Sequence, residues 1–253
     1  MKTNTSTTEL GRNPILTVLG ILILTVGLLA AGCESSEKQE SKGADKSNQK
    51  TTSQTASKDM ASDNAPNTSG VPKDLVDAGE FGENIYDAAK ADEWKTAASR
   101  IEELRAAVAT LKNQNIGAKE LPLVMEKLAK SVEEKNKSLA LQISNRFTFD
   151  VANLTAAYSP KVPVGITKLD FYGRELEIWA ASNNTTKLKE TTVALRSTWN
   201  SVKTKVEDHN GKKQAVAFEN LIARAEEAKS VMDYKRIATP ILDEVDNLEN
   251  VFE

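Results

Sequence analysis

The 253-residue chain contains one cysteine and one histidine. With one residue of each kind, the chain cannot form an internal disulfide, a CxxCH haem attachment, a His/Cys zinc cluster or a Cys/His catalytic pair. Its glycines form no phosphate-binding loop, and neither GxSxG nor P-loop spacing occurs. We therefore expect no cofactor and no enzymatic activity of a familiar kind. An enzyme that works with carboxylates alone is the remaining catalytic alternative.

Aromatic residues are also scarce, at 5% of the chain, and the charges nearly balance, with a formal net charge of −3. A core with so few aromatic rings is expected to pack mainly through aliphatic side chains. The basic residues are spread evenly after residue 70 and form no stripe of the kind that a nucleic-acid-binding surface requires. Nucleic acid is therefore not an expected partner.

The first 33 residues have three zones. A polar start carries Lys2 and Arg12 against one acid, Glu9; an apolar stretch runs from Ile15 to Ala31, and small residues then precede Cys33. This order is typical of an export signal. A membrane-spanning anchor is an alternative, because the apolar stretch approaches the roughly 20 residues that cross a bilayer. An ordinary secretory signal with an incidental cysteine is a second alternative.

The run Leu28-Leu29-Ala30-Ala31-Gly32-Cys33 resembles a bacterial lipobox. The most frequent lipobox has Leu three residues before the cysteine, where this chain has Ala30. The resemblance covers residues 1–33 and implies a lipoprotein precursor that is cut before Cys33 and carries diacylglycerol and an acyl chain such as palmitate on it. Two such lipid signals suffice for stable anchoring. The implied partner is thus a membrane, with the protein on its extracytoplasmic face.

The residue after the cysteine is Glu34. In many double-membrane bacteria an Asp at this position favours retention in the inner membrane, so that cue is absent here. The expected location is either the cell membrane or the outer membrane.

The segment 34–70 contains no Leu, Ile, Val, Phe, Tyr or Trp. Such a composition cannot bury enough apolar surface to offset the entropy of ordering, so we predict a disordered tether. Its mean reach is on the order of 35 Å for a flexible coil of this length. The tether is expected to act as a spacer, and binding of a partner is the alternative.

From residue 71 the composition changes to helix formers with aliphatic residues at three- and four-residue spacing, which predicts an all-α domain with a single core over 71–253. Residues 71–160 and 161–253 are interpreted as two repeats. The matching pairs include Val71-Pro72 with Val162-Pro163, Leu75 with Ile166, Phe81-Gly82 with Tyr172-Gly173, Ile85 with Leu176, Ala89 with Ala180, Leu104-Arg105 with Leu195-Arg196, Met125-Glu126 with Phe218-Glu219, and Glu133-Glu134 with Glu226-Glu227.

Each repeat is predicted to be an αα-hairpin, so that four long helices form an up-down bundle. In the first repeat the helices run over about 72–112 and 119–158, with a weak point at Ala91-Asp92. The second repeat has its weak point at Ser182–Asn184, and Pro240 lies inside the last helix, where it is expected to bend the helix or remove one backbone bond. The predicted core consists of Ile85, Ile101, Leu104, Val108, Leu128, Val132, Leu139, Ile143, Phe147, Val151, Leu154, Leu176, Leu195, Trp199, Val202, Leu221, Met232, Ile241, Val245 and Leu248.

Two groups of polar residues are candidate sites. The first lies near the apolar stripe of the helices. It is interpreted either as an interhelical ion pair or surface flank that fixes helix register, or as a site between helices for a small anionic or polar ligand. Its members are Arg146, Asp150, Tyr172, Arg174 and Glu175. The second is the acidic C-terminal end, interpreted as a solvated face or as a site for a hard cation such as calcium. Its members are Asp243, Glu244, Asp246, Glu249 and Glu253.

His209 is expected to be a surface residue in a polar turn. The sequence as a whole predicts a membrane-anchored extracytoplasmic lipoprotein whose helical domain is a binding or scaffold module. Its partner is expected to be an envelope protein, cell-wall material or a small ligand. The alternative is an accessory protein of the cell envelope that binds metal ions or small ligands through its carboxylate clusters.

Overall fold

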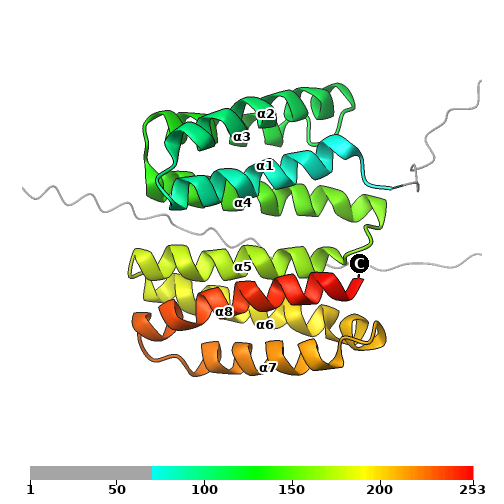
Figure 1. Ribbon diagram of the computed structural model, residues 1–253, viewed down its shortest axis with the longest axis vertical. Helices are drawn as coiled ribbons and strands as arrows, with labels where there is room; N and C mark the ends of the chain where they lie inside the picture. Colours follow the sequence, from blue (N-terminus) through cyan, green and yellow to red (C-terminus); the bar gives the residue numbers. More distant parts are fainter. Residues whose placement is uncertain (1–69, 253) are drawn as a thin grey trace, which may run out of the picture. The chain divides into compact units, whose positions relative to one another are not determined.

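The computed structural model describes residues 70–252. The predicted signal segment with Cys33, the predicted tether up to residue 69, and Glu253 lie outside these residues. The part that is described contains eight α-helices, two short 3-10 helices and no strand, which confirms the prediction of an all-α helical bundle. Figure 1 shows the helices lying side by side.

The first half of the described chain is a bundle of four helices. Helix α1 packs against both α2 and α4, and α3 packs against α2 and α4, so the four helices close on themselves. The elements are α1 Lys73–Lys90, α2 Trp94–Asn113, α3 Glu120–Glu133, α4 Lys137–Thr155 and the 3-10 helix η1 Ala156–Tyr158.

The second half has the same order of elements and the same neighbours. Helix α5 packs against α6 and α8, and α7 packs against α6 and α8. The elements are α5 Val164–Ala181, α6 Thr185–Asp208, α7 Lys212–Glu227, α8 Val231–Glu249 and the 3-10 helix η2 Asn250–Phe252. Helices α4 and α5 pack together and join the two halves (Figure 1).

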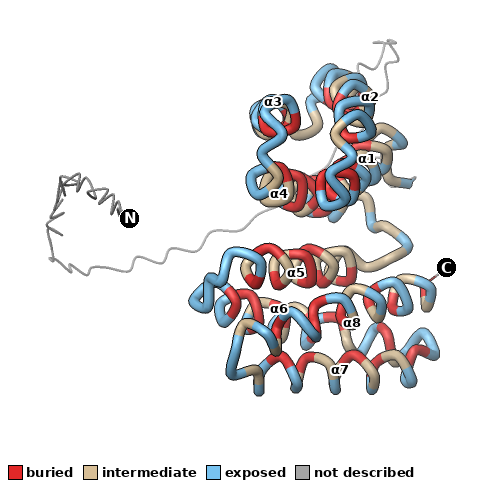
Figure 2. Tube along the Cα trace, turned by 60° about the vertical axis from the view of Figure 1, so that its left-hand side comes forward, coloured by how far each residue is buried: buried red, intermediate tan, exposed pale blue. Residues whose placement is uncertain are grey.

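The buried side chains form two separate hydrophobic clusters where the sequence predicts one core. The first cluster extends from Leu75 to Val151, and the second from Ile166 to Phe252. Figure 2 shows buried residues facing inward within each half. Each half therefore has a core of its own.

The two predicted weak points are breaks between helices. Asp92 lies between α1 and α2 with φ 61°, and Asn183 lies between α5 and α6 with φ 54°. Asp and Asn tolerate this left-handed conformation better than other side chains. The prediction that these two positions interrupt the helices is confirmed.

The prediction of one continuous helix over 119–158 is wrong, and so is its counterpart in the second half. The chain breaks before α4, where the Asn136 side chain accepts a hydrogen bond from the Leu139 N–H at 3.2 Å. It breaks again before α8, where Ser230 and Asp233 form a reciprocal capping box. These caps satisfy N–H groups at new helix starts, so each half contains four helices instead of one αα-hairpin.

Most of the predicted core residues are buried or half-buried, but two are not. Leu139 is 40% exposed and Met232 is 52% exposed. Both lie in the first turn after an unpredicted break, at the start of α4 and α8. Because a new helix begins there, the helical periodicity carried over from the preceding helix points to the wrong face.

Two glycines allow close approach of helices within the halves. A Cβ on Gly82 of α1 would lie 2.8 Å from Thr148 Cγ2 of α4, and a Cβ on Gly173 of α5 would lie 2.5 Å from Leu242 Cδ2 of α8. Both distances are below van der Waals contact. The pair that the sequence matches, Gly82 and Gly173, therefore lies at the corresponding helix crossing in each half.

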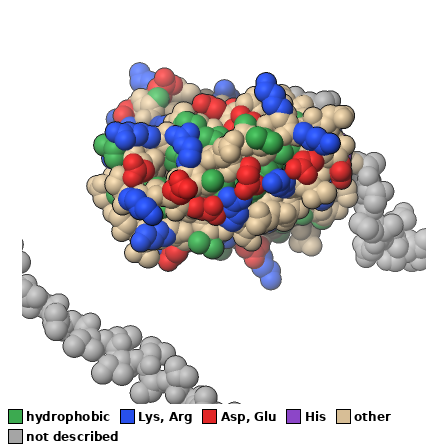
Figure 3. Space-filling model, turned by 90° about the horizontal axis from the view of Figure 1, so that it is seen from below, with side chains coloured by type: hydrophobic (Ala, Val, Ile, Leu, Met, Phe, Trp, Pro, Cys, Tyr) green, Lys and Arg blue, Asp and Glu red, His purple; other side chains and the backbone are tan. Residues whose placement is uncertain are grey.

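The surface is mixed in character. Figure 3 shows Lys and Arg interspersed with Asp and Glu on the face seen from below, without a region of one charge sign. Val193 on α6 and Val216 on α7 are 71% and 63% exposed. Over residues 70–252, no helix has both the length and the apolar content that crossing a bilayer requires.

Pro240 lies inside α8, as the sequence predicts. Pro72 and Pro163 are the N-cap residues of α1 and α5. A proline costs least at a helix start because its missing N–H has no intrahelical partner there. These prolines therefore suit the start of each half.

Candidate functional site

A buried guanidinium lies where the two halves meet. Arg174 of α5 is 8% exposed, and its Nη2 atom is 3.0 Å from Asp170 Oδ2 and 3.4 Å from Glu83 Oε2. The guanidinium carbon lies 5.1 Å from the centre of the Tyr86 ring on α1. The Arg174 cation of the second half thus contacts the Glu83 carboxylate and the Tyr86 ring of the first half. We call Glu83, Tyr86, Asp170, Arg174 and Glu177 the inter-bundle cluster.

Glu177 connects three helices within this cluster. Its Oε2 atom accepts hydrogen bonds from Tyr86 Oη at 3.1 Å and from Lys90 Nζ at 2.6 Å, both on α1. Its Oε1 atom lies 3.4 Å from Thr239 Oγ1 on α8. Burial and the Glu177 carboxylate raise the pKa of the Tyr86 phenol above its usual range. Tyr86 is therefore a neutral hydrogen-bond donor at any physiological pH.

Carboxylates outnumber cations around Arg174. Burial raises the pKa of Asp170 to about 7, and the nearby Arg174 guanidinium opposes this shift. Burial also raises the pKa of Glu249 to about 7, and the negative charges of Asp170 and Glu83 act in the same direction. Two carboxyl groups at this junction therefore change charge near neutral pH.

Three buried polar atoms have no hydrogen-bond partner in the described part of the chain: Arg174 Nη1, Asn145 Oδ1 and Trp179 Nε1. The amide nitrogen of Asn145 on α4 donates to the Phe171 carbonyl oxygen on α5 at 3.1 Å. This bond and the ion pairs of Arg174 fix α5 against both α4 and α1. The buried polar groups at this junction are thus best explained as a device that sets how the halves dock.

The first candidate group of the sequence analysis is not brought together. Arg146 and Asp150 form an ion pair along α4 at 2.9 Å, and the Arg146 side chain is 60% exposed. The Tyr172 ring lies 6.4 Å from Phe149, which Arg146 also covers at 5.3 Å. Arg174 belongs to the inter-bundle cluster instead. The Arg146–Asp150 pair lies within one helix, whereas Arg174 forms an ion pair between helices, with Glu83 of α1.

The second candidate group lies along α8. Asp243 and Asp246 are exposed, while Glu249 is half-buried beside the inter-bundle cluster. Over residues 70–252, no three His, Cys, Asp or Glu side chains are arranged to hold a metal ion.

Glu175, the remaining member of the first candidate group, accepts a hydrogen bond from Thr191 Oγ1 at 3.1 Å and so links α5 with α6.

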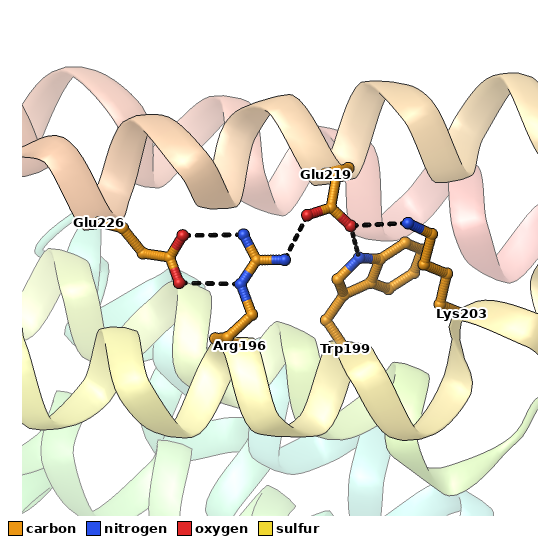
Figure 4. Close-up of polar contacts among 5 residues, drawn as sticks. All are labelled: Arg196, Trp199, Lys203, Glu219 and Glu226. Carbon is orange, nitrogen blue, oxygen red and sulfur yellow. Dashed lines mark hydrogen bonds and ion pairs between the residues drawn. The ribbon is translucent and has the colours of Figure 1, made fainter.

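A second polar network joins α6 to α7 in the second half (Figure 4). Arg196 forms a fork on Glu226, with Nε–Oε1 at 2.8 Å and Nη2–Oε2 at 2.9 Å, and its Nη1 atom pairs with Glu219. Glu219 also accepts hydrogen bonds from Trp199 Nε1 at 2.8 Å and Lys203 Nζ at 2.9 Å. These three donors lower the pKa of Glu219 to about 2. We call these five residues the α6–α7 network.

The corresponding helices of the first half, α2 and α3, have a simpler contact. Arg105 pairs with Glu126, and its Nε atom is 3.9 Å from Glu102 Oε2. Beside this pair lies a groove of about 570 Å³ lined by residues of α2 and α3. The sequence matches Arg105 with Arg196 and Glu126 with Glu219. This recurrence of an arginine and a glutamate in both halves is the sequence signal from which these ion pairs could have been predicted.

The chain is not similar to a known protein by any comparison made: no family model, no curated protein and no solved structure matches it. His209 is exposed at the end of α6, its Nδ1 atom 2.8 Å from the Lys205 carbonyl oxygen and its ring 4.7 Å from that of Phe252.

Proposed function

We propose that this chain is a lipid-anchored extracytoplasmic lipoprotein whose helical domain is a binding or scaffold module. The observation that carries the proposal is the run of residues 28–33, which ends in the only cysteine after an apolar stretch. Lipid attached to that cysteine would hold the chain at a membrane.

Two further features support this arrangement. The polar tract 34–70 has no Leu, Ile, Val, Phe, Tyr or Trp, as suits a spacer between an anchor and a domain. The first helix then begins at Lys73, close behind the tract. A compact helical domain at the end of a polar spacer suits the binding of a partner outside the cytoplasm.

Mass spectrometry of the mature N-terminus tests the anchor. We expect the chain to begin at Cys33 and to carry the added mass of the acyl groups. The matched control is Cys33→Ser, which removes the only thiol and is expected to leave the precursor unlipidated. An intact Met1 on the membrane-bound protein would contradict the proposed processing and favour a membrane-spanning anchor.

Protease treatment of cells with permeabilised outer layers tests the orientation. An extracytoplasmic domain is expected to be digested while a cytoplasmic marker survives. Purification from native membranes then tests the binding role. A stoichiometric protein partner supports it, whereas a persistent monomer with a bound small molecule favours a ligand-handling accessory protein.

A further inference from the structure

The groove between α2 and α3 has an apolar floor and charged walls. Ile101 and Val132 are each 4% exposed and lie at its base, with Ala98 and Ala129 beside them. Its volume of about 570 Å³ lies within the range typical of ligand sites, roughly 300–1,000 Å³. The groove is open to solvent along the two helices, so an extended or helical chain segment has access to it.

Two glutamates stand on α3 along this groove. Glu126 is paired with Arg105. Glu133, seven residues later, is exposed, and its carboxylate contacts no partner among residues 70–252. Lys130, the other cation of the groove wall, lies 3.7 Å from Glu134 and is partly neutralised by it. The groove wall therefore has one exposed carboxylate without a cationic partner and an excess of negative charge.

The second half shows which group satisfies this pair of glutamates. Glu219 and Glu226 are also seven residues apart on α7 and match Glu126 and Glu133 in the sequence. The Arg196 guanidinium lies between them, with a two-bond fork on Glu226 and an ion pair to Glu219. A planar guanidinium suits two carboxylates in this way better than an ammonium group does.

A difference in sequence beside Arg105 gives its guanidinium a competing carboxylate. Glu102 lies one helical turn before Arg105 and is within 3.9 Å of its Nε atom. At the same offset before Arg196 the chain has Val193, which has no charge to compete with Glu226. Glu102 and Glu126 together hold Arg105 away from Glu133.

We propose that the groove between α2 and α3 binds an arginine side chain from a segment of a partner protein, with Glu133 as its principal ligand. The guanidinium takes the place that Arg196 takes on Glu226, and the aliphatic part of the arginine lies on Ile101 and Ala129. This inference rests on the proposed function only in treating the domain as a binding module. Processing at Cys33 is tested by mass spectrometry alone, so either proposal can fail without the other.

The test is a titration of the full chain in mild detergent with the blocked tripeptide acetyl-Ala-Arg-Ala-amide, followed by amide chemical shifts in NMR spectra. We expect saturable shifts confined to α2 and α3. The same peptide with citrulline in place of arginine has nearly the same shape and no charge, and is expected to bind far more weakly. Equal binding of the two peptides, or shifts outside α2 and α3, would overturn the proposal.

Two neutralising variants compare the groove with its filled counterpart. Glu133→Gln is expected to weaken binding of the arginine peptide about fivefold, the scale of one partly exposed ion pair. Glu226→Gln removes the matching carboxylate of the other half and is expected to leave the affinity unchanged. Both residues are on the surface of helices, and a thermal melt checks that each variant folds. An unchanged affinity in Glu133→Gln would refute the assigned role of Glu133.

Two further variants are designed to fill the groove of the first half and to empty the matching position in the second half. Glu102→Val is expected to let Arg105 reach Glu133, so that the groove closes and the arginine peptide no longer binds. Arg196→Ala is expected to open a second site, with new peptide-induced shifts on α6 and α7. Peptide binding that is unaffected by Glu102→Val, together with no new shifts in Arg196→Ala, would show that a guanidinium between the two glutamates is not what the groove selects.

Discussion

The two halves of the described chain share an order of helices but differ in how their outer helices are joined. In the second half, Trp199 is fully buried against Phe218, with ring centres 4.9 Å apart, and its indole N–H reaches Glu219. In the first half, the position of Trp199 is taken by Val108, and α2 is linked to α3 by the Arg105 pair beside an open groove.

The same arrangement of four helices therefore has a closed polar network between its outer helices in the second half and an open groove in the first. The α6–α7 network satisfies its own charges, so the second half is complete by itself and suits a supporting role. The α2–α3 contact leaves the exposed Glu133 without a cationic partner and leaves space beside it. This contrast is the reason for proposing the first half, and not the second, as the binding half.

The largest effect is expected from Trp199→Ala. Removing a fully buried Trp should lower the free energy of unfolding by about 3–5 kcal/mol, because the variant loses apolar burial and leaves a cavity. Val108→Ala, the matched change in α2, should cost about 2 kcal/mol, since fewer buried carbons are removed. Urea unfolding gives the values, and amide hydrogen exchange should show the loss from Trp199→Ala concentrated in α5–α8. Faster exchange spread evenly over both halves would contradict independent cores.

A second prediction concerns the pH dependence of the free energy of unfolding. The contributions of the inter-bundle cluster and of the α6–α7 network to this free energy should change in opposite directions as pH rises. The pKa of Asp170 is raised from 3.8 to about 7, so its contribution to stability is present below about pH 4 and is lost as pH rises through 7. The pKa of Glu219 is lowered from 4.5 to about 2, so its contribution is present above pH 4.5 and is lost as pH falls toward 2. Stability should therefore be greatest in mildly acidic solution.

Between about pH 4 and 7 the fall in stability should reach at most about 1.4 kcal/mol per pH unit for each carboxyl group whose pKa is raised. Asp170→Asn should reduce this slope by about half, because the pKa of Glu249 is raised as well, and Glu219→Gln should flatten the profile below about pH 4.5. Chemical unfolding over a series of buffers measures both. The assignment to Asp170 fails if Asp170→Asn keeps the full slope of the unsubstituted protein between about pH 4 and 7.

The smallest effect is expected from the two matched arginines. Arg196→Met should lower the free energy of unfolding by about 1 kcal/mol more than Arg105→Met, because Arg196 has a fork and a second carboxylate while Arg105 has only exposed contacts, a pair with Glu126 and a longer one with Glu102. Thermal unfolding at low and moderate salt measures the difference, which should widen because salt screens the more exposed contacts of Arg105 first. Equal losses in the two variants would mean that the networks do not differ in strength.

The sequence predicts the helical class and two of the breaks because Asp92 and Asn183 are residues that interrupt a helix in a recognisable way. The break before α4 escapes prediction because Val132 and Leu139 keep helical spacing across it. The break before α8 likewise contains no strong helix breaker. Their signals are the capping residues Asn136 and Ser230, the latter with Asp233 three residues later. Reading these caps as helix starts would have given eight helices and two cores.

The candidate site is harder to predict because its partners are distant in sequence. Arg174 stands out in the sequence as a polar residue near an apolar stripe, but Glu83 and Tyr86 are contributed by another helix about ninety positions away. Periodicity places a residue on a face of its own helix and does not say which helix faces it. The α6–α7 network is more accessible to sequence analysis, since its arginine and glutamates recur in both halves.

The separation of the hydrophobic clusters has a consequence for the order of folding. All members of the first cluster lie between Leu75 and Val151, so every contact that completes this core is available before α5 is made. Local contacts of this kind favour rapid folding, and domains generally form in the order in which the chain emerges. The first half can therefore serve as a finished template on which α5 docks as the chain emerges, with Asn145 and Glu83 already in place to receive it.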